Sequence, residues 1–121
     1  MASKDELGRR GEQLATAYLT KQGYRILARN WRCVHGEIDI VAERLGVVAV
    51  VEVKTRSSTA YGHPFDAITA AKAARLRRLA VAWCDSAATA PRSLRVDAIA
   101  VLAPRGVADG DVVIEHLLGV C

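Results

Sequence analysis

Residues 36–56 read GEIDIVAERLGVVAVVEVKTR, a stretch in which charged side chains interrupt two short apolar segments. Ile and Val favour β structure, and they recur on both sides of Leu45-Gly46, so the stretch predicts two strands joined by a turn. Charged residues stand where a buried hairpin would be apolar, namely Glu37, Asp39, Glu52 and Lys54. The sequence therefore predicts a hairpin that carries a cluster of charge.

A turn at Leu45-Gly46 determines which residues face one another in this hairpin. With that turn, Asp39 lies across from Glu52 and Glu37 across from Lys54, so that all four side chains share one face. The opposite face then consists of Ile38, Ile40, Ala49, Val51 and Val53. Because Leu is unfavourable at positive φ, a bulged or longer turn is the alternative. A slip of one residue would move Glu52 away from Asp39, but it would also mix the two faces.

Two carboxylates that face each other repel, unless one keeps its proton or a cation lies between them. Lys54 alone cannot offset Asp39, Glu52 and Glu37. A divalent cation can, because Mg²⁺ takes oxygen ligands and commonly binds one or two carboxylates. Such an ion stabilises charge on a phosphoryl oxygen, and Lys54 would orient a water or neutralise charge in the transition state. The alternative is a solvated strand face with an ordinary ion pair; the spacing of Asp39 and Glu52-Val53-Lys54 within Val- and Ile-rich segments favours the cation site.

The bulk properties predict one cytoplasmic domain over residues 1–121. The chain has a net charge of +4, which favours anionic partners such as nucleic acid. It begins with a polar segment that does not resemble a signal peptide, and no apolar run approaches the ~18 residues of a membrane span, so no membrane is expected. Three cysteines without a CxxC pair argue against both a disulfide framework and a zinc ribbon.

Periodicity predicts the element order α-β-β-β-α-β-β. Ser3 and Glu6 have the spacing of a capping box at the start of a first helix. The predicted elements are a helix over 4–22, an edge strand over 24–32, the hairpin, a helix over 65–87, and strands over 93–102 and 112–120. This order indicates an α/β domain in which a mixed β-sheet is flanked by helices.

Asp39 with Glu52-Val53-Lys54 resembles the PD-(D/E)xK nuclease motif. Further segments extend the resemblance, namely Gly8-Arg9-Arg10-Gly11-Glu12, Gly23-Tyr24, Asn30-Trp31-Arg32, Gly36-Glu37-Ile38-Asp39, Val51-Glu52-Val53-Lys54-Thr55-Arg56 and Arg95-Val96-Asp97. Over residues 5–102 the chain resembles the YraN-type family of bacterial predicted endonucleases, which is similar to archaeal Holliday junction resolvases. The motif's leading proline is absent, and Glu37-Ile38 precedes Asp39, as is common in that family.

The resemblance implies a restriction-endonuclease-like core and roles for individual residues. Asp39 and Glu52 would bind Mg²⁺, with Mn²⁺ as a substitute, and the Val53 carbonyl would be a further ligand. Lys54 would be the catalytic lysine. Glu12 would complete the metal site directly or through water, although from the sequence alone it is a helical residue at the border of an apolar face. Glu37 is either a ligand or a neighbour of the ligands.

Basic residues around these segments are candidates for DNA binding through phosphate contacts. They are Arg9, Arg10, Arg56, Lys72 and Arg75, and each has a solvated surface cation as its alternative. Lys72 and Arg56 are preferred, because one opens the second helix and the other follows the catalytic strand. Other polar and aromatic residues are expected to be structural: Asp97 with Arg95 as an ion pair, Trp31 and Trp83 in packing, and His63 in a loop, with substrate contact as its alternative.

The resemblance and the residues together predict a metal-dependent endonuclease that hydrolyses phosphodiester bonds in structured or branched DNA, such as a Holliday junction. A resolvase-like arrangement would be a homodimer. One alternative is a nucleic-acid-binding or scaffold module of nuclease fold without turnover, which the intact Asp39, Glu52 and Lys54 argue against. A metal-stabilised structural protein is the other alternative, and the basic second helix argues against it.

Overall fold

The computed structural model describes residues 2–60 and 62–120, and the side chains from Glu6 onward. The strands are β1 (Arg25–Cys33), β2 (Gly36–Arg44), β3 (Val47–Arg56), β4 (Ser93–Leu102) and β5 (Val113–Leu117). The helices are α1 (Ala2–Lys21), α2 (Ala70–Ser86) and the short 3₁₀ turns η1 (Pro64–Ala67) and η2 (Asp109–Asp111). The predicted order and the α/β class are thereby confirmed, whereas Ser3 of the predicted capping box lies outside the described side chains.

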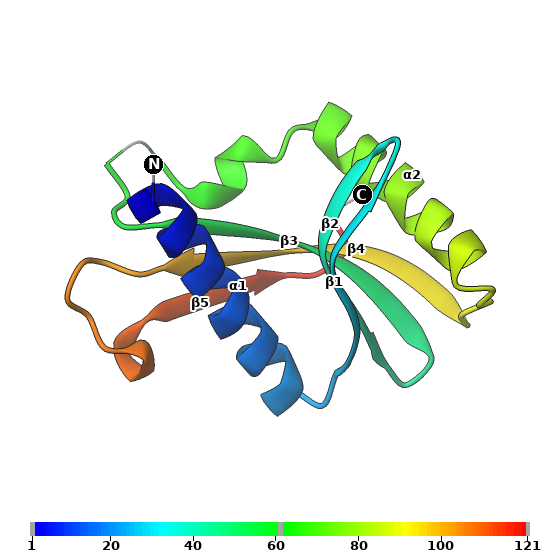
Figure 1. Cartoon of the computed structure of the whole chain (residues 1–121), viewed down its shortest axis with the longest axis horizontal. Coiled ribbons are helices and arrows are strands. Elements are labelled where there is room, and N and C mark those ends of the chain that lie inside the picture. Colours follow the sequence, from blue (N-terminus) through cyan, green and yellow to red (C-terminus); the bar gives the residue numbers. More distant parts are fainter. Residues whose placement is uncertain (1, 61, 121) are drawn as a thin grey trace.

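The five strands form one mixed sheet in the order β1-β2-β3-β4-β5. Only β3 and β4 are parallel, and α2 forms part of the crossover that joins them. All other neighbours are antiparallel, and β1 is an edge strand, as the sequence predicts. Figure 1 shows α1 and α2 on opposite sides of this sheet. None of the described helices is both long and apolar enough to cross a bilayer.

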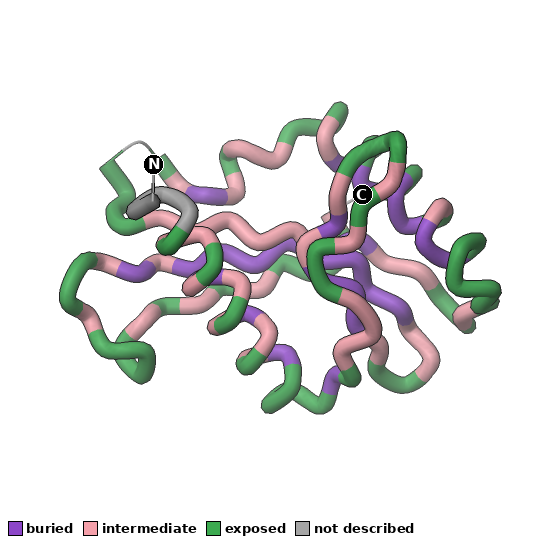
Figure 2. Tube along the Cα trace, in the orientation of Figure 1, coloured by how far each residue is buried: buried purple, intermediate pink, exposed green. Residues whose placement is uncertain are grey.

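Each helix covers its own apolar core on the sheet. The α1-side core contains Leu19, Ile40, Val51 and Ile99, and the α2-side core contains Val41, Val50, Leu76, Leu79 and Trp83. Figure 2 shows that buried residues follow the central strands and the inner faces of the helices. The sheet is therefore apolar on both faces at its centre, which explains the nearly continuous Val and Ala run of β3.

The β2–β3 turn has the residues that the sequence predicts. Leu45 and Gly46 both have positive φ, +54° and +80°, which is the backbone of a two-residue hairpin turn. The unfavourable conformation of Leu45 occurs at an exposed turn, where its side chain is 83% exposed. The ladder pairs Arg44 with Val47 and continues to Ile40 and Val51, so the predicted register is confirmed over this segment.

The ladder ends at Ile40 and Val51, earlier than predicted. The expected pairs of Asp39 with Glu52 and of Glu37 with Lys54 are therefore wrong as ladder pairs. Glu37 instead lies across from Arg32 of β1, and its Oε2 accepts a hydrogen bond from Arg32 Nε at 2.6 Å. The predicted apolar face is also wrong at one position, because Ile38 packs in the α2-side core and Ile40 in the α1-side core.

Two further boundaries differ from the prediction. The helix predicted from residue 65 is divided: η1 ends at Ala67, and α2 begins after Thr69, whose side chain accepts a hydrogen bond from the Lys72 N–H at 3.2 Å. The last strand ends at Leu117, because Gly119 adopts φ +67° and the Gly119 N–H donates to Asp97 Oδ1 at 3.0 Å. Local capping contacts therefore override the apolar periodicity at both points.

Asp97 organises a buried polar network beside α1. Its side chain is fully buried and accepts hydrogen bonds from Arg95 Nε at 2.7 Å and from Gly119, and His116 Nε2 lies 2.8 Å from it. Burial acts to raise the pKa of Asp97, but the His116 and Arg95 contacts outweigh it and the pKa is lowered. Arg95 also donates to Tyr24, and His116 lies 3.2 Å from the Tyr18 hydroxyl of α1. The predicted Arg95–Asp97 ion pair is confirmed, and the network reaches α1 through the contact between His116 of β5 and Tyr18.

Gly11 allows α1 to approach β3 closely. A Cβ atom at this position would lie 1.8 Å from Thr55 Oγ1 and 2.8 Å from Thr55 Cβ. Such distances are impossible for a real side chain, so any larger residue at position 11 forces α1 away from β3. This contact fixes the depth of α1 on the sheet and therefore the position of the next residue, Glu12.

We expect Gly11→Ala to lower the free energy of unfolding by about 2 kcal/mol or more, because the added methyl overpacks the α1–β3 contact. Urea unfolding followed by circular dichroism measures the change. Gly8→Ala is the matched control on the same helix: a Cβ atom there meets nothing within 4 Å, so the variant should be stabilised by ~0.5–1 kcal/mol. Thr55→Ala in the Gly11→Ala background should recover part of the loss. Equal effects at both glycines would contradict this packing.

Candidate active site

Asp39 lies at the fork where β2 and β3 separate. It is the first residue of β2 beyond the last ladder pair, and its Oδ2 accepts a hydrogen bond from the Val53 N–H at 2.8 Å. Beyond the last ladder pair no backbone carbonyl of β2 accepts a hydrogen bond from the Val53 N–H. The Asp39 carboxylate is the acceptor in its place. Because the N–H and C=O of one strand residue point to the same neighbouring strand, the Val53 carbonyl also faces this fork.

Glu52 and Lys54 lie on β3 beside the fork. Lys54 Nζ is 3.3 Å from Glu52 Oε2, and the two side chains are only 21% and 14% exposed, respectively. Side chains alternate along a strand, and Val53 packs in the α1-side core while Thr55 meets Gly11. Glu52 and Lys54 therefore point to the other side of the sheet from α1. The predicted proximity of Lys54 to a carboxylate is observed, with Glu52 as the partner.

Glu12 approaches the same region from α1, on the opposite side of the sheet. The pKa of Glu12 is raised. Burial is the largest cause, and the negative charges of Glu37 and Glu52 add to it, whereas the Arg29 charge acts to lower the pKa. A hydrogen bond from the Asn30 side chain also lowers it. Glu12 is thus close enough to sense the charged residues of β2 and β3 without forming an ion pair with Lys54.

The Asp39 carboxyl is held in an environment that disfavours its charge. Burial raises its pKa, the Val53 N–H opposes this, and the charge and hydrogen bonding of Glu52 raise it again, to about 8. Without a cation, Asp39 is therefore largely protonated at neutral pH. The repulsion between facing carboxylates that the sequence predicts is thus relieved by a proton.

The chemistry of these donor groups fits Mg²⁺ or Mn²⁺. Two carboxylates from adjacent strands and a carbonyl that faces the same fork are the hard oxygen ligands that these ions prefer. Over the described ranges 2–60 and 62–120, no three His, Cys, Asp or Glu side chains are close enough to form a complete cage. Mg²⁺ does not need one, because it keeps several waters and commonly binds one or two carboxylates. Asp39 and Glu52 could hold the ion, with Glu12 reaching it through water.

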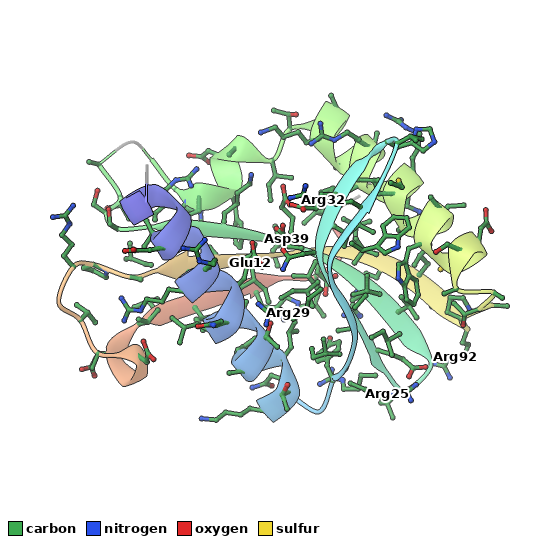
Figure 3. All side chains as sticks on the ribbon, viewed as in Figure 1. Glu12, Arg25, Arg29, Arg32, Asp39 and Arg92 are labelled. Atoms are coloured by element: carbon green, nitrogen blue, oxygen red, sulfur yellow. The ribbon has the colours of Figure 1, made fainter. Side chains whose placement is uncertain are left out.

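The strand β1 contributes residues that sequence reasoning missed. Figure 3 shows Arg29 and Arg32 on either side of Glu12 and Asp39, whereas Arg25 and Arg92 lie toward the other end of the hairpin. The Arg32 guanidinium is 80% exposed although it pairs with Glu37. In the sequence these arginines look like ordinary cations of an edge strand. Their spacing does not predict that Arg29 lies near Glu12 or that Arg32 pairs with Glu37.

A groove of about 360 Å³ runs between α1 and β3. Its walls are formed by Glu12 and Gly8 of α1 and by β3 from Val53 to Arg56. Arg56, one of the predicted phosphate-binding residues, lines this groove next to Lys54. The groove therefore leads along α1 from the fork and has a cation in its wall.

The other predicted phosphate-binding residues lie in different settings. Arg9 is exposed on α1, Arg75 is exposed on α2, and Lys72 is half-buried in the first turn of α2. Arg10 is already engaged: Nε donates to Asp109 Oδ1 at 3.1 Å, and Nη2 donates to the Val107 carbonyl at 2.6 Å. These contacts connect α1 to the loop before β5, so Arg10 acts structurally here.

The remaining residues considered from the sequence are structural. His63 caps η1 by accepting from the Phe65 N–H at 3.0 Å, and its Nε2 lies 2.7 Å from Glu115. Trp83 is buried in the α2-side core, and Trp31 packs against it, so the predicted packing roles are confirmed. Cys33 and Cys84 are free thiols. The third cysteine, Cys121, lies outside the described residues.

In the absence of metal, we expect stability to fall as the pH rises from 6 to 9. The unfolded chain loses the Asp39 proton at about pH 4, whereas the folded protein keeps it up to a pKa of about 8. Between these two pH values the folded state binds more protons than the unfolded state, so its free energy of unfolding falls as the pH rises. Urea unfolding in EDTA measures this slope, and Asp39→Asn should flatten it. Glu43→Gln, on the same strand but in an ion pair with Arg25, should keep the wild-type slope. An unchanged slope in Asp39→Asn would show that Asp39 titrates normally.

The sequence matches known proteins along most of its length. The model of the uncharacterised protein family UPF0102 matches residues 11–101. A UPF0102 protein of Leifsonia xyli subsp. xyli is 57% identical over 102 residues, which cover 84% of this chain and 86% of the relative. A UPF0102 protein of Arthrobacter sp. (strain FB24) is 54% identical over 120 residues, 99% of each chain. A third, from Paenarthrobacter aurescens, is 52% identical over 122 residues, 100% of this chain and 98% of the relative. The chain belongs to the uncharacterised protein family UPF0102, the YraN-type family.

Proposed function

We propose that this protein is a metal-dependent endonuclease that hydrolyses phosphodiester bonds in DNA, with branched or otherwise structured DNA as its substrate. The observation that carries the proposal is the Asp39 carboxyl at the fork between β2 and β3, where it accepts the Val53 N–H and faces Glu52. A buried carboxyl that keeps its proton beside a second carboxylate is a position at which a divalent cation can take the place of the proton. We infer that a divalent cation does so.

The roles of the side chains follow from their positions. Asp39 and Glu52 would hold Mg²⁺ or Mn²⁺, with the Val53 carbonyl on the same side of the fork. The bound ion supplies Lewis-acid stabilisation of the charge that develops on the scissile phosphate. Lys54, 3.3 Å from Glu52, supplies N–H donors and a positive charge that can orient the attacking water and offset charge in the transition state. Glu12 lies across the fork and can accept a proton from water.

Charge and shape support DNA as the substrate. The chain carries a net charge of +4, and arginines lie along β1 and in the groove wall beside the fork. Such cations neutralise phosphates without reading base sequence. Both long helices pack on the sheet as parts of the α/β fold, and the described residues form no separate recognition module such as a zinc finger. These features favour recognition of DNA shape over sequence.

We expect the purified protein to cut labelled four-way junctions or flaps in Mg²⁺ or Mn²⁺, and not in EDTA. Glu52→Gln and Asp39→Asn should each lower the cleavage rate by on the order of 10²–10³-fold, because each removes a carboxylate that would hold the cation, and the cation supplies the charge that stabilises the transition state. Gel-based rates on junction, flap, single-stranded and duplex DNA measure both the activity and the preferred substrate.

Glu43→Gln is the matched control, since Glu43 lies on β2 but pairs with Arg25 away from the fork. It should cut like the wild type. Cleavage that survives in both Asp39→Asn and Glu52→Gln, or that resists EDTA, would contradict the assignment. Metal-independent binding of DNA with no cutting in any divalent cation would instead identify a binding module of nuclease fold.

A further inference from the structure

The turn that follows β4 presents an exposed arginine. It runs from Pro104 to Val107, where the Val107 N–H donates to the Pro104 carbonyl at 3.2 Å and Gly106 adopts φ +77°. Positive φ at the third position of a four-residue turn favours glycine. Arg105 occupies the second position of this turn, and its side chain is exposed.

Arg10 of α1 holds this loop in place. Its Nε donates to Asp109 Oδ1 at 3.1 Å, and its Nη2 donates to the Val107 carbonyl at 2.6 Å. The Asp109 carboxylate also offsets the charge of Arg10. These contacts leave the Arg105 guanidinium unpaired in the described part of the chain, on a loop that is fixed to the helix.

A cavity of about 610 Å³ lies beside Arg105. It is at the carboxyl ends of the parallel strands β3 and β4, where the Ala103 N–H donates to the Arg56 carbonyl at 2.8 Å. Leu7 and Arg10 of α1 line its other side, and Figure 1 shows these strand ends beside the first half of α1. Ligands of open α/β sheets commonly bind outside the carboxyl ends of strands.

The cavity adjoins the groove that leads to the fork. Leu7 of α1 and Ser57, the residue after β3, line both spaces. Arg56 lines the groove and Arg105 lines the cavity, so each part of this path has a cation in its wall. A DNA strand with its scissile phosphate at the fork would have neighbouring phosphates along the path.

We propose that the cavity beside Arg105 is a subsite for the DNA backbone, in which Arg105 binds a phosphate of the cut strand next to the scissile one. This inference rests on the proposed function, because it places the scissile phosphate at the fork. It extends that function by assigning the course of the strand, past Arg56 to the turn after β4. Arginine binds phosphate oxygens through two parallel N–H donors, and such contacts position DNA without reading its bases.

The first test is the binding of a labelled four-way junction in EDTA, measured by fluorescence anisotropy at several salt concentrations. Arg105→Gln should raise the dissociation constant by about 5–10-fold at 0.1 M salt, because one phosphate contact is lost. The slope of log affinity against log salt should become shallower by about 1. Arg105→Lys, which keeps the charge, should retain most of the affinity, and the urea midpoints should not change.

Arg92→Gln is the matched control. Arg92 is an exposed arginine that directly precedes β4, whereas Arg105 follows this strand of 10 residues. A strand of that length spans about 30 Å, and Figure 3 shows Arg92 far from Asp39. Both variants lose one positive charge. Equal losses of affinity in the two would show an effect of net charge alone and would overturn the proposal.

Glu6 offers a variant with the opposite expected effect. It is exposed and lines the cavity, so its charge opposes a bound phosphate. Glu6→Gln should therefore bind the junction more tightly than the wild type, a gain that a folding defect cannot cause. Glu43→Gln changes the net charge equally, but Glu43 pairs with Arg25 away from the path, so it should bind like the wild type.

Cleavage in Mn²⁺ separates binding from chemistry. Under single-turnover conditions, Arg105→Gln should need about 5–10-fold more protein for half of the maximal rate and should reach the wild-type rate at saturation. A methylphosphonate, which lacks the phosphate charge, is then placed at successive positions beside the cut. At one position it should weaken binding by the wild type but cause no further loss in Arg105→Gln, which identifies the phosphate that Arg105 contacts.

Failure of this inference is distinguishable from failure of the proposed function. Wild-type affinity and salt slope in Arg105→Gln, or additive methylphosphonate losses at every position, would overturn the subsite and leave the endonuclease site standing. A wild-type protein that binds the junction with an Arg105-dependent salt slope, but cuts no DNA in any divalent cation, would overturn the proposed function while the phosphate contact stands. Absence of both binding and cutting would overturn both.

Discussion

The hydrogen bond from the Val53 N–H to the Asp39 carboxylate is the interaction on which the candidate site depends. It occurs where β2 and β3 stop pairing, and it satisfies a backbone donor that the ladder leaves without a partner. An unpaired donor at this depth would be costly, so the carboxylate stabilises the fork as well as shaping it. Burial raises the pKa of the same carboxylate, and the charge of Glu52 beside it raises the pKa further, so that the pair needs a proton or a cation. The Asp39 side chain thus both stabilises the fork and forms part of the candidate cation site.

The rest of the fold places other groups around this fork. The Gly11–Thr55 contact brings α1 close enough for Glu12 to reach the region, and the buried Asp97 network secures the other half of α1 through His116 and Tyr18. The parallel pairing of β3 with β4 holds Glu52 and Lys54 on a strand that has neighbours along its whole length. The catalytic candidates therefore project from regular helix and strand, whereas β1 beside them has a left-handed backbone at Asn30 and a register shift between Ile26 and Ala28.

Sequence reasoning succeeded where short-range pattern decides the structure. The hairpin register follows from Val and Ile on both sides of Gly46, and β4 was predicted from its β-branched residues over the observed range Ser93–Leu102. The convergence of Asp39 and Glu52 could be predicted from that register, although the two residues do not form a ladder pair. The start of α2 was misplaced because the apolar pattern continues through Phe65 and Ile68, while the Thr69 cap begins the helix later.

The failures concern features that depend on tertiary structure. The fork and the change of face at Ile38 coincide with a left-handed backbone at Asn30, opposite Asp39, which a strand-like sequence does not indicate. Arg29 was missed because its position near Glu12 depends on how β1 packs relative to α1, and Arg32 because its ion pair with Glu37 depends on the pairing of β1 with β2. Arg10 is engaged by Asp109, almost a hundred residues away, and no local pattern reveals such a contact.

The most direct test of the central claim is the anomalous scattering of a crystal of this protein soaked in Mn²⁺. The account predicts a single strong peak at the fork, within bonding distance of carboxylate oxygens of both Asp39 and Glu52. A fork without a peak in a crystal that binds Mn²⁺ elsewhere would contradict it.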